Sequence, residues 1–316
     1  MAAAASARRP AHATTPMRSP TLRIGPHEPH VNATLRLALP KGRMQAGIFQ
    51  LMSDAGLPVR AGSREYRPTL PLADVEAKIL KPQTIVEMLH LGRRDLGFAG
   101  ADWVAELGAE LVEVLDTGLD PVQLVAAAPR DLLVNGALPA RPLVVASEYA
   151  RLTKAWIARN AIDATFVRSF GATEVFPPDD ADCIVDNTAT GATLAANGLA
   201  IVDTLMRSST RLYAHPAALD VPEKRANVER IVMLLRSVIE ARTRVMVEVN
   251  VSAADLEAVV AALPCMREPT IAMLHHGAGY AVKAAVPRAK LPMVIPEIKA
   301  RGGTDIVVSA LGQIVP

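Results

Sequence analysis

From residue 35 onward the sequence alternates between strand-like and helix-like apolar patterns, and this alternation limits the fold more than any other feature. Leucine occupies every second position over 35–39, which predicts a strand. Over 44–55 apolar residues recur at steps of three and four, which predicts a helix, and Gly56 follows as a typical helix end. A strand, a turn and a helix in this order open an α/β fold.

The same alternation continues to about residue 205. Further strands are predicted at Ala77–Leu80, Leu96–Ala99, Leu111–Leu115, Val122–Ala127, Leu143–Ala146, Ala164–Val167, Cys183–Asp186 and Ala200–Leu205. Helices are predicted at Thr84–Leu91, Asp102–Leu107, Leu152–Asn160 and Ala192–Asn197. A proline-rich segment at 138–142 interrupts the series. We therefore predict a doubly wound α/β part of two lobes over residues 34–225, with the second lobe at about 130–205.

Residues 226–316 show a different order of elements. A helical pattern over Asn227–Arg242 forms a linker. The elements that follow are predicted at Val245–Val249, Ala253–Leu263, Thr270–Leu274, Tyr280–Val286, Ile295–Ala300 and Asp305–Ser309. Their order is strand, helix, strand, strand, helix, strand, which is the signature of a ferredoxin-like domain.

Composition excludes several classes of protein. Half of the 316 residues are hydrophobic, which is enough for a sizeable core and excludes global disorder. The net charge of +2 argues against a nucleic-acid binder. No apolar run approaches the roughly 18 residues of a membrane span. Cys183 and Cys265 are far apart in apolar surroundings, so we expect two free thiols and a cytoplasmic protein.

Residues 1–33 differ in composition from the rest of the chain. They contain Arg8, Arg9, Arg18 and Arg23 against the single acid Glu28, together with five prolines. They lack the apolar stretch of a secretory signal. We expect a disordered tail, and the alternative is an organelle transit peptide, which is also rich in arginine and poor in acids.

The stretch 181–194 has the strongest chemical signal in the sequence. An apolar strand ends at Asp186, and Thr190-Gly191-Ala192-Thr193 follows just before a predicted helix. Backbone amides and hydroxyls in such a turn suit a phosphate ester, while a carboxylate suits sugar hydroxyls or a magnesium ion. Together they indicate a phosphorylated sugar. The alternative is that Thr190 only caps a helix and Asp186 only ends a strand.

The turn Pro40-Lys41-Gly42-Arg43 is a second candidate anion site. Two cations flank a glycine between a strand and a helix, where backbone amides point at the same place. Arg64 can add charge to the same cleft. The alternative is a solvated turn with surface cations.

Other common chemistries lack support in the sequence. The Walker A, HExxH, CxxC and GxSxG motifs are absent. His275 and His276 are adjacent after a predicted strand, and neighbours on a strand face opposite ways, which argues against a shared metal.

Several motifs in register resemble those of the ATP phosphoribosyltransferases. They are Leu39–Arg43, Ile79–Gln83, Asp95–Gly100, Asp116–Asp120, Gly171–Val175, Asp186–Leu194, Asn197–Leu199 and Arg207–Leu212. The resemblance covers nearly the whole chain after residue 34. The segment after residue 243 also resembles the C-terminal module of the long form of this family, at Pro269-Thr270, Leu274, Lys299, Gly302 and Gly303.

The resemblance implies a reaction and a fold. In this family N1 of ATP displaces pyrophosphate from C1 of 5-phosphoribosyl diphosphate, with magnesium required, as the first step of histidine biosynthesis. The catalytic part resembles a two-lobed periplasmic-binding-protein fold with its active site in the cleft. The family also implies inhibition by histidine at the C-terminal domain, and assembly into dimers and hexamers.

The resemblance also implies roles for individual residues. Thr190, Gly191, Ala192 and Thr193 would hold the 5-phosphate, and Asp186 would grip the ribose hydroxyls and is the one candidate metal ligand. The remaining group, Lys41, Gly42, Arg43 and Arg64, would face ATP or the departing pyrophosphate. By the same resemblance the catalytic residues are Lys41, Arg43 and Asp186.

The chain departs from the family pattern near these residues. Asn187 and Thr188 follow the loop's aspartate, where two apolar residues are usual, and Ala189 replaces a hydroxyl residue. Lys81 replaces the arginine of an Arg-Pro-Gln stretch, and lysine lacks the planar fork of arginine. The alternative function is a non-enzymatic two-lobed protein that binds a small ligand.

Overall fold

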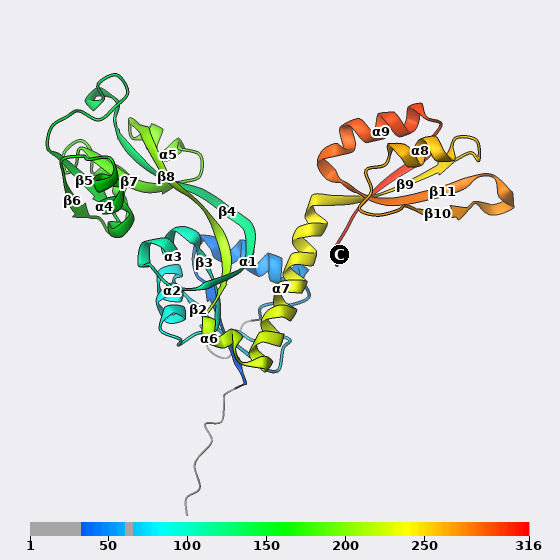
Figure 1. Cartoon of the computed structure of the whole chain (residues 1–316), viewed down its shortest axis with the longest axis horizontal. Helices are drawn as coiled ribbons and strands as arrows, with labels where there is room; N and C mark the ends of the chain where they lie inside the picture. Colours follow the sequence, from blue (N-terminus) through cyan, green and yellow to red (C-terminus); the bar gives the residue numbers. More distant parts are fainter. Residues whose placement is uncertain (1–32, 61–65, 316) are drawn as a thin grey trace, which may run out of the picture. The chain divides into compact units, whose positions relative to one another are not determined.

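The computed structural model describes residues 33–60 and 66–315. The larger of the two sheets in this part of the chain has eight strands, in the order β2-β1-β3-β8-β4-β7-β5-β6 (Figure 1). The strands are β1 (Leu35–Pro40), β2 (Val75–Leu80), β3 (Leu96–Gly100), β4 (Val112–Pro129), β5 (Leu143–Ser147), β6 (Ala164–Arg168), β7 (Cys183–Thr188) and β8 (Leu199–Ala214). The tail and transit-peptide expectations for the N-terminal segment concern residues outside the described ones.

Two long antiparallel strands join the lobes. β1 pairs in parallel with β2 and β3, and β5 pairs in parallel with β6 and β7. Between these groups, β4 and β8 run side by side and contribute to both lobes (Figure 1). This is the two-lobed α/β arrangement that the sequence predicts.

The lengths of β4 and β8 differ from the prediction. The sequence predicted two strands at 111–115 and 122–127, where the structure has the single strand β4 of 18 residues. For β8, which has 16 residues, the sequence predicted only 200–205. The register of β4 against β8 shifts between Asp116 and Leu119 and again before Val122. Gly118 and Asp120 have positive φ values of 66° and 48° there. These irregularities break the period-two pattern by which a strand is read from sequence.

Helices cover both faces of each lobe. In the order of the chain they are α1 (Arg43–Asp54), α2 (Pro82–His90), α3 (Ala101–Leu107), α4 (Ala150–Arg159), α5 (Ala192–Ala196), α6 (Pro216–Leu219) and α7 (Pro222–Thr243), with short 3-10 turns η1 (Arg130–Leu132) and η2 (Thr173–Val175). In the first lobe α1 and α7 pack on one face and α2 on the other. In the second lobe α4 packs on one face and α5 on the other.

Helix α7 is part of the first lobe's core. Val228, Ile231 and Leu235 are buried in the same apolar cluster as Leu37 and Phe98. The helix also carries Lys224, which joins a buried ion pair. The helix that the sequence assigned to a linker therefore covers one face of the first sheet.

That ion pair connects β1, β3 and α7. The carboxylate of Asp95 accepts hydrogen bonds from Arg36 Nε at 2.9 Å and from Lys224 Nζ at 3.0 Å. Burial alone would raise the pKa of Asp95, but the hydrogen bonds from Arg36 and Lys224 outweigh it and hold the pKa below the ordinary value.

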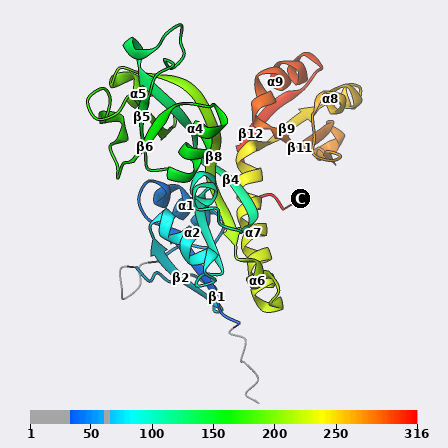
Figure 2. The same cartoon turned by 60° about the vertical axis from the view of Figure 1, so that its left-hand side comes forward.

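The C-terminal domain has the predicted ferredoxin-like order. Its elements are β9 (Arg244–Val251), α8 (Leu256–Ala262), β10 (Thr270–Met273), η3 (His275–Gly277), β11 (Tyr280–Pro287), η4 (Arg288–Lys290), α9 (Leu291–Ala300) and β12 (Thr304–Ala310). The antiparallel sheet has the order β10-β11-β9-β12, and α8 and α9 cover one of its faces (Figures 1 and 2). Helix α9 begins four residues before the prediction, because Pro292 is tolerated in the first helical turn.

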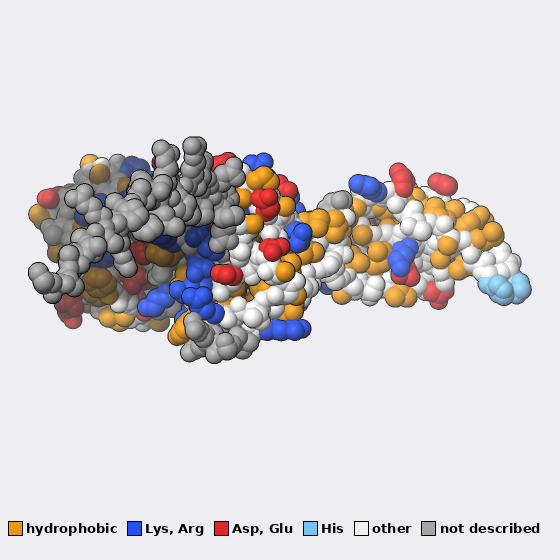
Figure 3. Space-filling model, turned by 90° about the horizontal axis from the view of Figure 1, so that it is seen from below, with side chains coloured by type: hydrophobic (Ala, Val, Ile, Leu, Met, Phe, Trp, Pro, Cys, Tyr) orange, Lys and Arg blue, Asp and Glu red, His pale blue; other side chains and the backbone are white. Residues whose placement is uncertain are grey.

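The histidine pair lies in the turn between β10 and β11 and not on a strand. His276 has a φ of 57°, and the two rings are 3.7 Å apart between centroids. Histidine side chains are visible at one end of this domain in Figure 3. The prediction that the two side chains face opposite ways on a strand is therefore wrong. Within 33–60 and 66–315, no group of three or more metal-ligating side chains occurs.

The chain end returns toward the first lobe. Ile314 N donates to Ser237 O on α7 at 2.9 Å, and Gln313 Nε2 donates to Asp54 O at the end of α1 at 3.1 Å. None of the helices in the described part of the chain is long and apolar enough to span a membrane.

Candidate active site

The turn after β1 places two cations at one cavity. Gly42 has a φ of 87° and a ψ of −144°, a conformation that a residue with a Cβ rarely adopts. It turns the chain sharply into α1, whose first residue is Arg43. Lys41 N donates to Leu80 O at 2.8 Å, which fixes this turn against β2.

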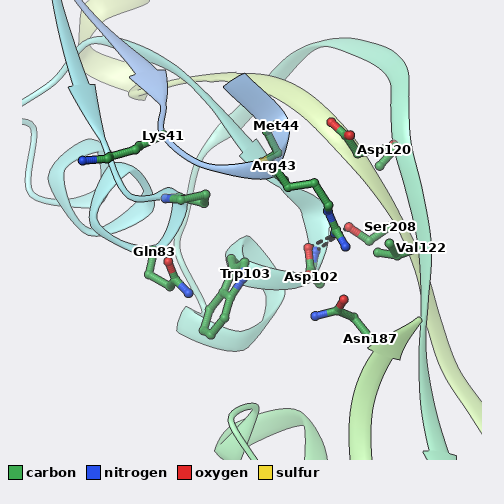
Figure 4. Close-up of a pocket in the computed structure, with 12 residues that line it drawn as sticks. Lys41, Arg43, Met44, Gln83, Asp102, Trp103, Asp120, Val122, Asn187 and Ser208 are labelled. Atoms are coloured by element: carbon green, nitrogen blue, oxygen red, sulfur yellow. Dashed lines mark hydrogen bonds between the residues drawn. The ribbon is translucent and has the colours of Figure 1, made fainter. Parts of the chain in front are cut away.

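The first cavity has a volume of about 310 Å³. It is lined by Lys41, Arg43, Met44, Pro82, Gln83, Asp102, Trp103, Asp120, Val122, Asn187, Ser208 and Ser209. Figure 4 shows Arg43, Asp102, Ser208 and Asn187 around a common space, while the Lys41 side chain points away from it. Lys41 Nζ donates to Tyr66 Oη at 2.8 Å.

The second cavity, of about 390 Å³, contains the predicted phosphate loop. It is lined by Arg43, Glu148, Gly171, Ala172, Thr173, Glu174, Asp186, Asn187, Thr188, Ala189, Thr190, Ala192, Thr193 and Leu194. Arg43 and Asn187 line both cavities, so the two spaces adjoin. Within the described residues Arg43 forms no ion pair with a carboxylate, and its charge is available to an anion in either space.

The loop itself is held by short local hydrogen bonds. Gly191 has a φ of 78°, and its N–H donates to Thr188 Oγ1 at 2.9 Å. Ala192 N donates to Thr190 Oγ1 at 3.3 Å, so Thr190 does support the start of α5. The Thr193 side chain is exposed at the second cavity. Its hydroxyl can therefore meet a ligand directly.

Asp186 lies among other acids. Glu148 and Glu174 line the same cavity. Burial, with smaller contributions from Glu174 and Glu148, raises the pKa of Asp186 to about 6 against the opposing hydrogen bond from Asn187 N at 2.7 Å. Asp186 therefore holds its proton more strongly than an ordinary aspartate does.

These acids fit a divalent cation that arrives with a substrate. Carboxylate oxygens are the ligands that Mg²⁺ prefers, and Mg²⁺ is commonly held by one or two of them together with substrate phosphates. Neither cavity contains a closed set of ligands among the described residues. Asp186, with Glu148 or Glu174, would hold such an ion from one side.

The structure brings together most of the residues singled out from sequence. Lys41 and Arg43 line the first cavity, and Arg43, Asp186, Thr190, Ala192 and Thr193 line the second. Gly42 and Gly191 shape the turns that carry them. Arg64 lies outside the described residues.

Sequence reasoning assigned no role to several other lining residues. In the first cavity these are Asp102, Trp103, Asp120, Ser208 and Ser209, and in the second they are Glu148, Thr173 and Glu174. Asp120, Thr173, Glu174 and the two serines fall within motifs that carried the resemblance, which was the one signal that pointed to them.

The fold and the site together define a class of protein. It is a two-lobed α/β protein in which a loop of hydroxyls and backbone amides on one lobe adjoins a cation from the other lobe.

Comparisons with known proteins identify the family. The family model described as ATP phosphoribosyltransferase matches residues 81–237, and that of the HisG C-terminal domain matches residues 241–313. An ATP phosphoribosyltransferase of Chlorobium phaeovibrioides is 34% identical over 90% of this chain and 98% of its own. One of Pelotomaculum thermopropionicum is 33% identical over 89% of this chain and 99% of its own. The chain belongs to the ATP phosphoribosyltransferase family, in its long form.

A solved structure agrees in fold. A chain of the ATP phosphoribosyl transferase (HisG:HisZ) complex from Thermotoga maritima matches with a TM-score of 0.57 and 21% identity. The match covers 64% of this chain and 99% of that one. Members of the family catalyse the first step of histidine biosynthesis, as the resemblance in the sequence implied.

Proposed function

We propose that the two adjoining cavities bind 5-phosphoribosyl diphosphate and ATP, and that N1 of ATP displaces pyrophosphate from C1 of the sugar between them. The observation that carries this proposal is the position of Arg43. Its cation lines both cavities and lies opposite a loop of amides and hydroxyls. Anionic groups of two substrates can thus meet at one cation.

The phosphate loop anchors the sugar. Thr190, Gly191, Ala192 and Thr193 hold the 5-phosphate through backbone amides and the Thr193 hydroxyl. Gly191 N and Ala192 N, which donate to threonine hydroxyls of the loop, would exchange those partners for the phosphate. Asp186, at the end of β7, accepts hydrogen bonds from the ribose hydroxyls. Both contacts fix the sugar on the second lobe with C1 toward the first cavity.

The cations act on the leaving group. As the bond from C1 to pyrophosphate breaks, positive charge develops on the sugar and negative charge grows on the pyrophosphate. Arg43 and the backbone of Gly42 stabilise that negative charge. The Lys41 ammonium donates to Tyr66 and would have to turn toward the cavity to join them. Positioned cations and oriented amides supply this kind of catalysis without a nucleophilic side chain.

The family needs a divalent metal, and we propose that it is Mg²⁺. When bound, Mg²⁺ neutralises charge on the pyrophosphate. Asp186 would hold it beside the ribose.

The C-terminal domain carries the regulatory part of the proposal. Residues 244–316 would bind histidine as a feedback inhibitor, and residues 34–243 would carry catalysis, since α7 packs in the first lobe. This boundary at 243 replaces the one predicted from the sequence at 225. We further propose dimers and hexamers as the assembly and the cytoplasm as the location.

The substitution Thr193→Val tests the phosphate loop. It keeps the shape of the side chain but removes the hydroxyl, so we expect the KM for 5-phosphoribosyl diphosphate to rise roughly ten- to a hundredfold. The KM for ATP should change much less. The measurement is the initial rate of pyrophosphate release with each substrate varied in turn.

Thr165→Val is a matched control, because Thr165 is exposed on β6 of the same lobe and lines neither cavity. Equal effects of Thr193→Val on both substrates would contradict the loop assignment. If the unmodified protein binds both substrates yet releases no pyrophosphate, the chain is a binding protein and the enzymatic proposal fails.

A further inference from the structure

Asn187 has a position that the phosphate loop does not explain. It follows Asp186 on β7, and successive side chains on a strand point to opposite faces. While Asp186 serves the second cavity only, Asn187 lines both. It is also one of the residues at which this chain departs from the apolar pattern of its family.

A buried hydrogen-bond chain fixes the amide of Asn187. Ser208 Oγ donates to Asp102 Oδ1 at 2.7 Å, and Tyr149 Oη donates to Asp102 Oδ2 at 2.6 Å. Because the single proton of the Tyr149 hydroxyl is used in the hydrogen bond to the Asp102 carboxylate, its oxygen can only accept a further hydrogen bond. Asn187 Nδ2 donates to that oxygen at 2.9 Å. The amide nitrogen therefore faces Tyr149, and the carbonyl oxygen Oδ1 faces another way.

The surroundings of Tyr149 keep this chain rigid. Tyr149 and Asp102 are buried. The ring of Tyr149 stacks on Trp103 with 4.7 Å between centroids. The Glu106 carboxylate accepts hydrogen bonds from the backbone N–H groups of Arg151 and Leu152, which joins α3 to the start of α4. The anchor of Asn187 is thus held from both lobes.

The free atom of this amide is Oδ1. Figure 4 shows it on the side of the cavity toward which Arg43 extends. Within the described residues Oδ1 has no hydrogen-bond partner, and it is not a buried unsatisfied atom. It is an oriented acceptor at the wall between two cavities, and Met44, Trp103 and Val122 supply apolar surface in the first of them.

The chemistry of the reaction identifies the donor that fits. N1 of adenine must approach C1 of the sugar, so the bond forms where the two cavities meet. The exocyclic 6-amino group is attached to the carbon next to N1. We infer that Asn187 Oδ1 accepts a hydrogen bond from the 6-amino group of ATP, so that Asn187 selects a 6-aminopurine and holds N1 toward the sugar. This inference rests on the proposed function and adds a specificity-determining residue to it.

The test compares two nucleotides in two proteins. ATP and purine riboside 5′-triphosphate both carry N1, but only ATP has the 6-amino group. Asn187→Leu keeps the size of the side chain and removes the acceptor. With ATP we expect kcat/KM to fall about three- to tenfold, as for one neutral hydrogen bond, and with the analogue to stay within about twofold. The preference for ATP over the analogue should therefore shrink by the same three- to tenfold.

Tyr149→Phe provides a second variant that retains Asn187. It removes the acceptor for Nδ2 and frees the amide to rotate, so the preference for ATP should fall as well, by a smaller factor. The analogue is also a weaker nucleophile at N1, and for this reason the preference is compared between proteins.

Three results would overturn the inference. They are an equal loss with both nucleotides in Asn187→Leu, no loss with ATP, or a wild-type enzyme that uses both nucleotides equally well. The last of these results is obtained with the wild-type enzyme alone, so it does not depend on whether a variant folds. A wild-type protein that releases no pyrophosphate from ATP would instead remove the proposed function itself.

Discussion

At the scale of single residues, Asp186 links stability to function. Its pKa of about 6 lies above that of an unfolded aspartate, near 4. The folded state therefore favours the protonated form, and ionisation above about pH 6 costs stability. The protein thus loses folding stability by ionising Asp186, the residue that the proposed reaction needs as a carboxylate.

Asp186→Asn should therefore stabilise the ligand-free protein while removing activity. The gain in the free energy of unfolding is absent below about pH 4, grows between pH 4 and 6, and reaches about 1–3 kcal/mol above that range. Denaturant melts of the two proteins at pH 4 and pH 7.5, without metal or substrate, measure it. An equal difference at both pH values would show that the proton is not involved.

Residues of the site differ in how far sequence could find them. Asp186 and Thr190–Thr193 were singled out because a strand end, a glycine and two hydroxyls stand together within eight residues. Asp102 and Ser208 were missed, since 106 positions separate them and only the pairing of β3 with β8 brings them together. Asn187 was noticed as a departure from the family pattern, but the orientation of its side-chain amide depends on a hydrogen bond to Tyr149, which is distant in sequence.

At the scale of elements, Asp95 joins β1, β3 and α7 through Arg36 and Lys224. Asp95→Asn leaves the Lys224 ammonium, with 10% of its side chain exposed, without an anionic partner. We expect a loss of about 3 kcal/mol in the free energy of unfolding at pH 7. The lowered pKa makes the wild-type advantage complete above about pH 4 and removes it as the pH falls through the folded-state pKa.

Glu248→Gln is the control for a general effect of charge. Its partner Lys283 lies 2.6 Å away, but both side chains are about half exposed. Such a pair contributes about 0–1 kcal/mol. Chemical denaturation of both variants across pH 3–8 makes the comparison, and a similar small loss in each would contradict the role of Asp95.

Elements were predicted well where the pattern was local. The parallel strands β1, β3, β5 and β7 each contain a short alternating or apolar run, and the order of the C-terminal elements was predicted correctly. The long strands β4 and β8 were read as fragments, because bulges at 116–122 and the polar run 207–211 obscure their period. Two residues of that polar run, Ser208 and Ser209, line the first cavity. The polar side chains that the site requires are thus the ones that hide the strand pattern in the sequence.

At the scale of the whole molecule, α7 decides where the chain can be divided. A chain that ends near residue 221 lacks Val228, Ile231 and Leu235, each a buried side chain worth about 1.5–3 kcal/mol. The loss approaches the whole stability of a typical domain, so we expect no cooperative melt by circular dichroism.

A chain that ends at residue 243 retains the core of the first lobe. It should melt cooperatively and, on the proposed division of labour, lose inhibition by millimolar histidine. Inhibition is measured as pyrophosphate release with and without histidine, and the full chain serves as the reference. If the full chain is active but insensitive to histidine, the C-terminal domain serves assembly and not regulation.

The long return strand β8 also sets the order in which the protein can form during translation. β3 pairs with β8 and is covered by α7, so the first lobe needs two stretches with the second lobe's sequence between them. At roughly 5–20 residues per second, the ribosome takes on the order of ten seconds to make the chain between β3 and α7. The second lobe's strands β5, β6 and β7 are complete by residue 188. The apolar faces of β1, β2 and β3 therefore stay uncovered in the nascent chain until the strands of the second lobe have been synthesised. We expect the need for a chaperone to be greatest in that interval.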